Sequence, residues 1–248
     1  MNLSSAKLLI TGAGRGIGQY LALQLLDSVE KLIVVDHDDE LLRRLPRHPR
    51  LISFSCNLVE SGAVQKLIRE IFEDHGGINV CINNAGVIHS EPLINTLSKE
   101  EKKHSIESWK KVIDINLNAV FYVTANVVEQ LTLRKQPGLI INISSISAQG
   151  NMGQSAYAAS KAAIEALTKS WSKELGMFKI RTAAIAPGFF NTPSTRESLS
   201  EGMLSKWQKS VPLNRLGELD ELLNAVRFVI ENDYFNGKIL SLDGGLTL

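Results

Sequence analysis

The chain has 248 residues, 44% hydrophobic and 21% charged, which suits a globular protein that buries a sizeable core. Its 27 lysines and arginines balance 26 aspartates and glutamates, so its charge gives no support for nucleic-acid binding. No apolar run approaches the roughly 20 residues of a membrane span. The amino terminus, MNLSSAKLLITGAG, enters a strand-like run at once, so we expect no signal peptide, no membrane partner and a cytoplasmic location.

Short apolar runs rich in valine, isoleucine and leucine recur along the chain. They predict buried strands at 7–11, 31–36, 51–55, 78–84, 138–144, 180–187 and 238–243. Longer amphipathic stretches predict helices at 18–28, 58–75, 105–134, 155–177 and 218–231. This alternation predicts an α/β fold with one mostly parallel sheet of seven strands, helices on both of its faces, and a single domain over residues 1–248.

A glycine-rich turn follows the first predicted strand. The sequence TGAGRGIG places Gly12, Gly14, Gly16 and Gly18 between this strand and the next helix. Glycines allow a tight turn and let backbone N–H groups approach a pyrophosphate at a helix N-terminus. The spacing is G-x-x-x-G-x-G, because Ile17 occupies the last glycine's place in the G-x-G-x-x-G form. The alternative is a turn that only closes the strand.

An acidic residue ends the second predicted strand. Asp36 lies twenty residues beyond Gly16, where a carboxylate can accept hydrogen bonds from both ribose hydroxyls of an adenosine and repels a 2′-phosphate. Asp36 can instead cap the helix entered through HDDELL, but Asp38 and Asp39 offer the same cap. The residues therefore predict a dinucleotide site that favours NAD, and Arg15 in the glycine turn is the opposing signal for NADP.

The predicted helix at 155–177 contains an unusual pair. Tyr157 and Lys161 are four residues apart and share one face of the helix. A free phenol has a pKa near ~10, too high for ready proton exchange at neutral pH, and a nearby ammonium stabilises the phenolate and lowers that value. The pair predicts a general acid/base tuned by its neighbour; the alternative is a surface pair without chemistry.

Five motifs occur in a characteristic order: TGAGRGIG, NNAG at 83–86, NISS at 142–145, YAASK at 157–161 and APG at 186–188. Together they resemble the short-chain dehydrogenase/reductase family, and the resemblance extends from Lys7 to the closing DGGLTL. It implies a doubly wound Rossmann fold, and an enzyme that transfers a hydride between a nicotinamide cofactor and a secondary alcohol or ketone. A non-catalytic nucleotide sensor or structural subunit is the alternative, and the presence of all four residues of the family's tetrad argues against it.

The resemblance implies a catalytic tetrad of Asn116, Ser145, Tyr157 and Lys161. Tyr157 would exchange the proton, Lys161 would also bind the nicotinamide ribose, Ser145 would hold the substrate oxygen, and Asn116 would support a water chain to solvent. Ser144 is the rival serine, because many relatives place the catalytic serine thirteen residues before the tyrosine. The loop here resembles a subset that is one residue shorter, so we expect Ser145.

The resemblance also implies a set of cofactor-binding residues. These are Gly12, Gly14, Arg15, Gly16, Ile17, Gly18, Asp36, Asn57, Leu58, Asn84, Ala85, Gly86, Tyr157, Lys161, Pro187, Gly188 and Thr192. Thr192 would bind the carboxamide, and the segment 189–213 would fold over the substrate. We expect NAD, with NADP as the alternative, and no metal, because His89, His104 and the other histidines lack metal-ligand spacing and read as solvated loop residues.

Local resemblances point to two substrate classes. SKEEKKHSIESWKKVIDINL, IAPGFFNTP and the carboxyl-terminal stretch resemble type II 3-hydroxyacyl-CoA dehydrogenases, which use NAD. SSISAQGNMGQSAYAASKA resembles 3-oxoacyl-acyl-carrier-protein reductases, which mostly use NADPH; Arg134, Lys135 and Lys179 are either a contact for an acidic carrier protein or ordinary surface residues. The resemblance also implies a homotetramer that pairs the helices at 105–134 and 155–177, with Phe121, Val128 and Trp171 on their outward faces.

Overall fold

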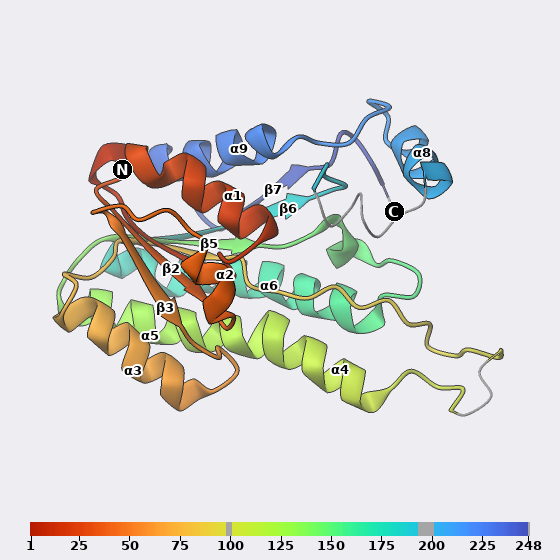
Figure 1. The fold of residues 1–248 in the computed structure, drawn as a ribbon, viewed down its shortest axis with the longest axis horizontal. Coiled ribbons are helices and arrows are strands. Elements are labelled where there is room, and N and C mark those ends of the chain that lie inside the picture. The colour runs from red at the N-terminus through yellow and green to blue at the C-terminus, as the bar shows by residue number, and fades with distance from the viewer. Residues whose placement is uncertain (98–100, 193–200, 248) are drawn as a thin grey trace.

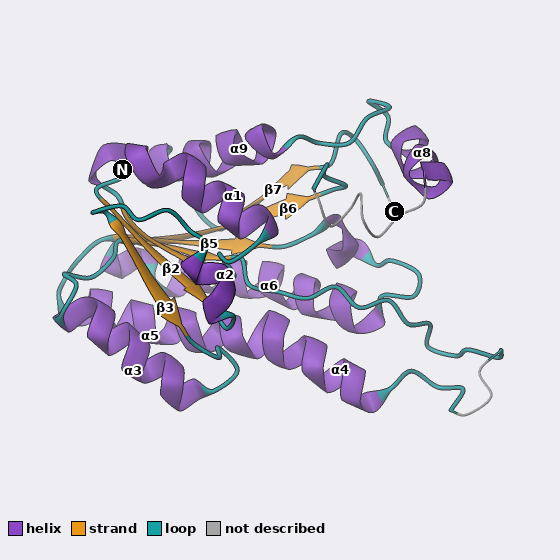
Figure 2. Cartoon of the chain, viewed as in Figure 1, coloured by secondary structure: helices purple, strands orange, loops and turns teal. Residues whose placement is uncertain are grey.

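The computed structural model describes residues 1–97, 101–192 and 201–247, and these contain one sheet of seven strands (Figures 1 and 2). The strands are β1 (Lys7–Thr11), β2 (Lys31–Asp36), β3 (Leu51–Ser55), β4 (Val80–Asn83), β5 (Gly138–Ile143), β6 (Ile180–Pro187) and β7 (Lys238–Leu242). Their order is β3-β2-β1-β4-β5-β6-β7, and every pairing is parallel. The predicted doubly wound fold is confirmed, and its sheet is wholly parallel among the described strands.

Helices cover both faces of the sheet. They are α1 (Gly16–Leu25), α2 (Asp39–Arg43), α3 (Ser61–Glu73), α4 (Ile106–Ile113), α5 (Ala119–Leu133), α6 (Ser155–Glu174), α8 (Glu201–Ser210) and α9 (Leu219–Glu231). Helices α1 and α9 lie on one face, and α3, α4, α5 and α6 lie on the other (Figure 1). None of the described helices is long and apolar enough to cross a bilayer.

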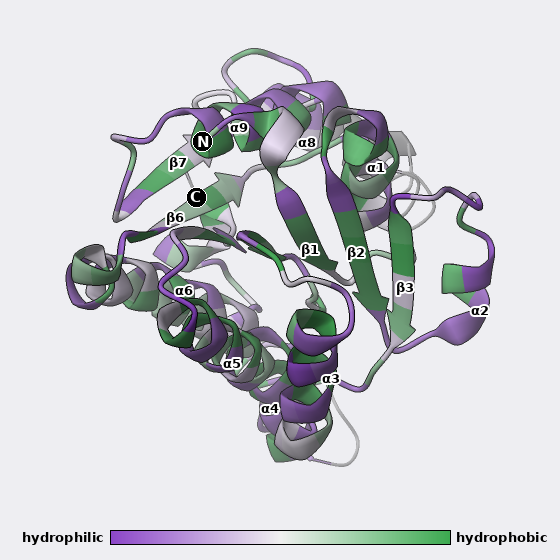
Figure 3. Ribbon diagram, turned by 90° about the vertical axis from the view of Figure 1, so that its left-hand side faces the viewer, coloured by the Kyte–Doolittle hydropathy of each residue, from purple (hydrophilic) through white to green (hydrophobic). Residues whose placement is uncertain are grey.

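The two cores explain why the strands are apolar without alternation. In β1, Leu8 and Ile10 pack into the cluster under α1 and α9, whereas Leu9 packs into the cluster under α3, α5 and α6. Successive side chains of a strand point to opposite faces, so a sheet covered on both sides buries nearly every position of its central strands, whereas the edge strands β3 and β7 keep exposed positions. Figure 3 shows the strands β1, β2 and β3 largely in green, whereas the helices carry both green and purple residues.

The single helix predicted at 105–134 is interrupted. Helix α4 begins after Ser105, whose side chain accepts a hydrogen bond from the Ser108 N–H, and a π-helical segment, Asp114–Asn118, separates it from α5. Such wide turns insert one residue into the helix and are frequent at functional sites. Here the wide turn carries Asn116, which is completely buried. The predicted boundaries are therefore correct, and the interior is not a continuous α-helix.

The order of the strands reverses between β1 and β4, from which the chain proceeds toward opposite edges of the sheet. In open α/β sheets, ligands bind at the carboxyl ends of the strands at such a switch point. The glycine turn follows the carboxyl end of β1. The segment after β4 and the serines after β5 follow the carboxyl ends of the neighbouring strands, so all three lie at this end of the sheet.

Candidate active site

Close packing requires glycine in the turn after β1. A Cβ at Gly12 would lie 2.7 Å from the Ala85 Cα, and one at Gly18 would lie 2.2 Å from the Gly12 carbonyl oxygen. The Asn84 side chain also supports this turn, because its Nδ2 donates to the carbonyl oxygens of Thr11 and Gly12, both at 3.0 Å. The turn is therefore fixed before α1 begins, and the first N–H groups of that helix face the edge where a pyrophosphate would bind.

Thr11 is a supporting residue that no motif in the sequence marks. Its Oγ1 accepts hydrogen bonds from the N–H groups of Asn84 and Ala85, both at 3.1 Å, and so joins the ends of β1 and β4. The only signal in the sequence is a hydroxyl at the end of an otherwise apolar strand. Asn84 and Ala85 thus shape the cofactor turn through Thr11 and Gly12.

Asp36 is buried against the glycine turn, and its side chain is only 6% exposed. Its Oδ2 accepts a hydrogen bond from the Gly14 N–H at 2.9 Å, and its Oδ1 accepts one from the Asp38 N–H at 3.1 Å and lies 3.0 Å from His37 Nδ1. Asp38 caps α2, accepting from the N–H of Glu40. Each carboxylate oxygen of Asp36 still has lone-pair capacity for a ribose hydroxyl.

The other predicted cofactor residues lie along the same edge. Arg15 is exposed and directly precedes α1, and Ile17 is half-buried against the core. After β3, Asn57 Oδ1 accepts a 3.4 Å hydrogen bond from the Val59 N–H, and Leu58 packs on the apolar cluster under α3. A nicotinamide dinucleotide fits this arrangement, because the glycine turn leaves room for a pyrophosphate beside a helix N-terminus and Asp36 supplies a carboxylate for the ribose.

Two adjacent serines after β5 point to different neighbours. Ser145 is buried and hydrogen-bonded with the Tyr157 phenol, and its Oγ also accepts from the Ser147 N–H at 3.1 Å. Ser144 Oγ instead donates toward α6, to Glu165 Oε1 at 3.0 Å and to the Lys161 carbonyl oxygen at 3.3 Å. The structure brings Ser145 together with Tyr157 and turns Ser144 away from it.

Lys161 lies beside Tyr157, with its Nζ 5.7 Å from the centre of the phenol ring. The Nζ donates a 2.7 Å hydrogen bond to the carbonyl oxygen of Ile143, the last residue of β5. Burial removes the ammonium from water and lowers the pKa of Lys161 to about 8.

The phenol itself departs from the expectation drawn from the sequence. Burial raises the pKa of Tyr157, and the hydrogen bond with Ser145 only partly opposes this effect. The reason is that desolvation disfavours the phenolate, while the ammonium expected to stabilise it is bonded to a backbone carbonyl. Tyr157 is thus held in its protonated form at neutral pH, as a proton donor requires.

A family model and several named proteins are similar to this chain. A family model described as short chain dehydrogenase matches residues 6–202. This chain belongs to the short-chain dehydrogenase family. The enzyme is therefore an oxidoreductase that uses a nicotinamide cofactor.

The 3-oxoacyl-[acyl-carrier-protein] reductase FabG of Thermotoga maritima is 34% identical to this dehydrogenase over the full length of both chains. The protein of the same name from Chlamydia muridarum is 39% identical over 199 residues, covering 79% of this chain and 75% of the relative. Among solved structures, the aldohexose dehydrogenase of Thermoplasma acidophilum superimposes with a TM-score of 0.83 at 29% identity, covering 98% of this chain and 94% of that one.

Asn116 of the dehydrogenase joins the segment after β4 to α6, the helix that carries Tyr157. Its Oδ1 accepts from the Val87 N–H at 2.8 Å, and its Nδ2 donates to the Val87 carbonyl oxygen at 2.9 Å and lies 3.3 Å from Ser160 Oγ. A Cβ at Gly86 would lie 3.3 Å from Asn116 Oδ1 and 3.6 Å from Lys161 Nζ. Gly86 therefore leaves open the space between two predicted catalytic residues.

The segment predicted to cover the substrate is described only in part, because residues 193–200, including Leu199, lie outside the described ranges. Pro187 ends β6, and the Gly188 N–H donates to the Leu242 carbonyl oxygen at 2.9 Å. Thr192 is buried, and Phe189 stacks on Trp207 of α8, with 4.1 Å between ring centroids. The predicted contact of Thr192 with a carboxamide stays a prediction.

Of the two histidines after β4, His104 is not the solvated loop residue that we expected, and His89 is half-buried. His104 is only 7% exposed, and His89 Nε2 lies 2.9 Å from Glu91 Oε2. The correction has a structural cause: an antiparallel bridge between Ile94 and Lys103 folds the chain back and brings His104 beside Glu91 and His89, thirteen and fifteen positions earlier. The spacing of the histidines in the sequence does not show that the chain folds back here.

Proposed function

We propose that this dehydrogenase interconverts 3-oxoacyl and 3-hydroxyacyl thioesters with NAD(H). The observation that carries the reaction is the buried, hydrogen-bonded pair of Ser145 and Tyr157 beside Lys161, at the same sheet edge as the glycine turn. The thioester class is supported by the relatives named 3-oxoacyl-[acyl-carrier-protein] reductase, and the choice of NAD by Asp36.

The proposed residues divide the chemistry of carbonyl reduction among them. The nicotinamide supplies the hydride when it is bound. Ser145 and Tyr157 donate hydrogen bonds to the substrate oxygen, and these bonds strengthen as negative charge develops in a site shielded from water. Tyr157 then transfers its proton to that oxygen, and the positive charge of Lys161 acts on the resulting phenolate over the 5.7 Å between its Nζ and the centre of the phenol ring. Asn116 supports the path by which the proton is replaced.

Cofactor preference provides a direct test of the role of Asp36. We expect kcat/KM for NADH to exceed that for NADPH at least tenfold, a difference of about 1.4 kcal/mol, because the carboxylate meets a 2′-phosphate as a like charge. Asp36→Ala should narrow or invert this ratio, since it leaves Arg15 in place. Asp39→Ala is the matched control: this exposed carboxylate pairs with Arg43, and its loss should leave the ratio unchanged. Wild-type enzyme that prefers NADPH would contradict the assignment.

The alternative, an NADPH-dependent reductase that docks an acyl carrier protein, is favoured by the names of the relatives. Within one chain, the basic residues suggested for docking lie far from Tyr157. Lys135 and Lys179 lie just before β5 and β6, at the amino ends of the strands, whereas Tyr157 lies at the carboxyl ends. The Arg134 guanidinium lies over the Phe72 ring, 5.1 Å from its centre. Comparing one 3-oxoacyl group carried on coenzyme A and on carrier protein, each with both cofactors, separates the two candidates.

We also propose that the dehydrogenase is a homotetramer paired through α4, α5 and α6. One expected contact residue is wrong, because Trp171 is buried in the core under α6. Phe121 on α5 is 49% exposed and Trp109 on α4 is 39% exposed, so this surface retains apolar area for a partner.

Light scattering coupled to gel filtration should report a tetramer for the wild-type chain at micromolar concentration. Phe121→Glu should lower the mass, because it places a charge in the proposed contact. Leu23→Glu, a similar change on α1 at the other face of the sheet, should not. A wild-type monomer would refute the proposal.

A further inference from the structure

Two imidazoles and a carboxylate meet after β4, in a group that the proposed reaction does not use. His89, Glu91 and His104 each offer one ligand atom, and these atoms all lie within 4.8 Å of one another. Glu91 Oε2 is at their centre, 2.9 Å from His89 Nε2 and 3.6 Å from His104 Nδ1. We call these three residues the His–Glu–His cluster.

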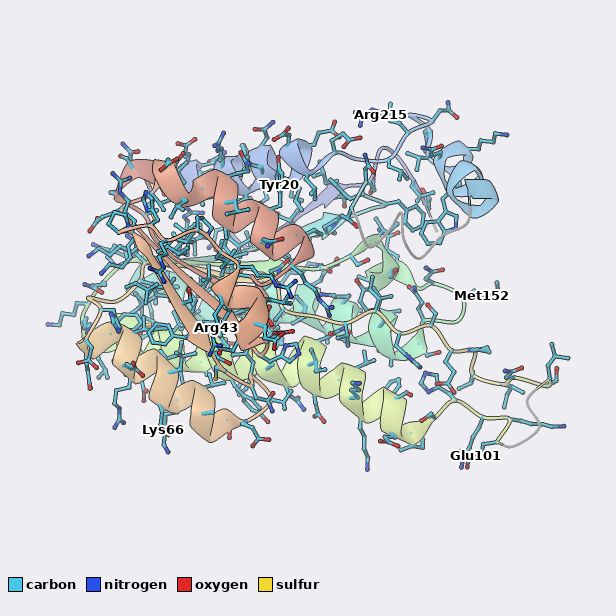
Figure 4. All side chains as sticks on the ribbon, viewed as in Figure 1. Tyr20, Arg43, Lys66, Glu101, Met152 and Arg215 are labelled. Carbon is cyan, nitrogen blue, oxygen red and sulfur yellow. The ribbon has the colours of Figure 1, made fainter. Side chains whose placement is uncertain are left out.

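The backbone brings the cluster together at the base of a hairpin-like excursion. The His104 N–H donates to the Leu93 carbonyl oxygen at 2.9 Å, and the Asn95 N–H donates to that of Lys102 at 2.6 Å. In Figure 1 this segment extends away from the sheet before α4, and Figure 4 labels Glu101 on it. His89 and Glu91 enter the excursion and His104 leaves it, so the cluster joins its two ends.

Surrounding contacts hold the three side chains in place. Glu91 Oε1 accepts a 2.9 Å hydrogen bond from the Ser105 N–H, which leaves Oε2 directed at the imidazoles. The His104 ring is buried and lies edge-on to Trp109, with 6.5 Å between centroids. The neighbours of a metal-binding carboxylate or imidazole usually orient it in this way.

We propose that the His–Glu–His cluster binds one divalent transition-metal ion of the Zn²⁺ class. Two imidazole nitrogens and one carboxylate oxygen form a ligand set typical of Zn²⁺, with a fourth position for water. Bonds of about 2.1 Å in a tetrahedral site separate ligand atoms by roughly 3.4 Å. The distances of 2.9 and 3.6 Å bracket that value, so small side-chain movements suffice.

Metal binding here competes with two existing contacts. His89 Nε2 and Glu91 Oε2 form a hydrogen bond, and a metal ion would replace the proton between them. His104 Nδ1 lies 2.8 Å from the Ser105 carbonyl oxygen, so binding through this nitrogen requires the tautomer with its proton on Nε2.

The proposed metal would act on the segment that leads into α6 and not in the hydride transfer. The Glu91 N–H donates to the Gly153 carbonyl oxygen at 2.6 Å, and Gln154, which precedes α6, donates from Nε2 to Ser90 Oγ at 3.1 Å. The segment after β4 is thus bonded to the start of the helix that carries Tyr157. A metal would close the excursion at its base and fix it against that helix.

The test is binding of Zn²⁺ to the full chain, purified without a histidine tag and stripped with a chelator. Equilibrium dialysis should give one Zn²⁺ per chain, and Co²⁺ should give the visible absorption of a tetrahedral site with imidazole ligands. Glu91→Gln preserves an acceptor for the Ser105 N–H, yet it should weaken Zn²⁺ binding at least about tenfold and abolish the Co²⁺ absorption. His89→Gln should do the same.

Matched controls exclude binding elsewhere on the chain. His48→Gln removes a histidine distant in sequence, and Cys56→Ser removes the half-buried thiol; both variants should bind Zn²⁺ as the wild type does. Circular dichroism of each variant checks that it is folded. A wild-type chain that binds no Zn²⁺ at 100-fold molar excess, or that binds it equally after Glu91→Gln, would overturn the proposal and assign the cluster to proton sharing alone.

Discussion

Tyr157→Phe should lower kcat at least about 100-fold, the scale of general acid/base catalysis. The substitution keeps a buried ring and removes only the hydroxyl that is hydrogen-bonded with Ser145. Because the ring still packs against Val112 and Ala156, the fold and the binding of NADH should be nearly unchanged. Steady-state kinetics, with fluorescence titration of NADH, separates the two effects.

Tyr122→Phe is the control for this experiment. Tyr122 is a half-buried tyrosine on α5 whose ring packs on the core under α3, and its hydroxyl has no role in the proposed site. Its removal should leave kcat near the wild-type value. If Tyr157→Phe also retained nearly full activity, the acid/base assignment would be wrong.

Ser145→Ala should lower kcat by about 100-fold, because it removes a hydrogen bond to the substrate oxygen that strengthens in the transition state. Ser144→Ala is the matched control one residue earlier. It removes hydrogen bonds to Glu165 and to the Lys161 carbonyl, so its effect should be mild and should appear mainly as a lower thermal midpoint.

Kinetics and thermal unfolding of the two serine variants provide the comparison. The reverse ranking, with Ser144→Ala the more damaging, would mean that the loop before Tyr157 has been aligned one residue out of register. Equal and mild effects would remove both serines from the proposed tetrad.

The fold was largely predictable because its strands are buried on both faces. Runs such as KLIVVD are apolar between their charged ends, and the structure places β2 at 31–36, as the pattern predicts. Short or irregular elements carry no such periodicity. The wide turn at Asp114–Asn118 and α8 were not predicted, since each depends on tertiary contacts.

The candidate site was predictable where a motif is local in sequence. Tyr157 and Lys161 share a helix face because they are four residues apart, and Ser145 was selected by the length of one short loop. The roles of Thr11 and of the Ile143 carbonyl were missed, because each bonds a partner more than fifteen residues away. The direction of the Tyr157 pKa shift and the His–Glu–His cluster likewise depend on burial and chain return, which no local pattern encodes.

The buried Lys161 ammonium has a cost that concerns the whole fold. In the unfolded chain this lysine stays protonated up to its ordinary pKa of 10.5, whereas in the folded chain its pKa is about 8. Between these values the unfolded state binds the extra proton, so the lysine's contribution to the free energy of unfolding rises with pH. At neutral pH the free energy of unfolding is therefore lower by about 3 kcal/mol than it is above pH 10.5, where this lysine is neutral in both states. A residue that we propose to be catalytic therefore makes the native state less stable at neutral pH.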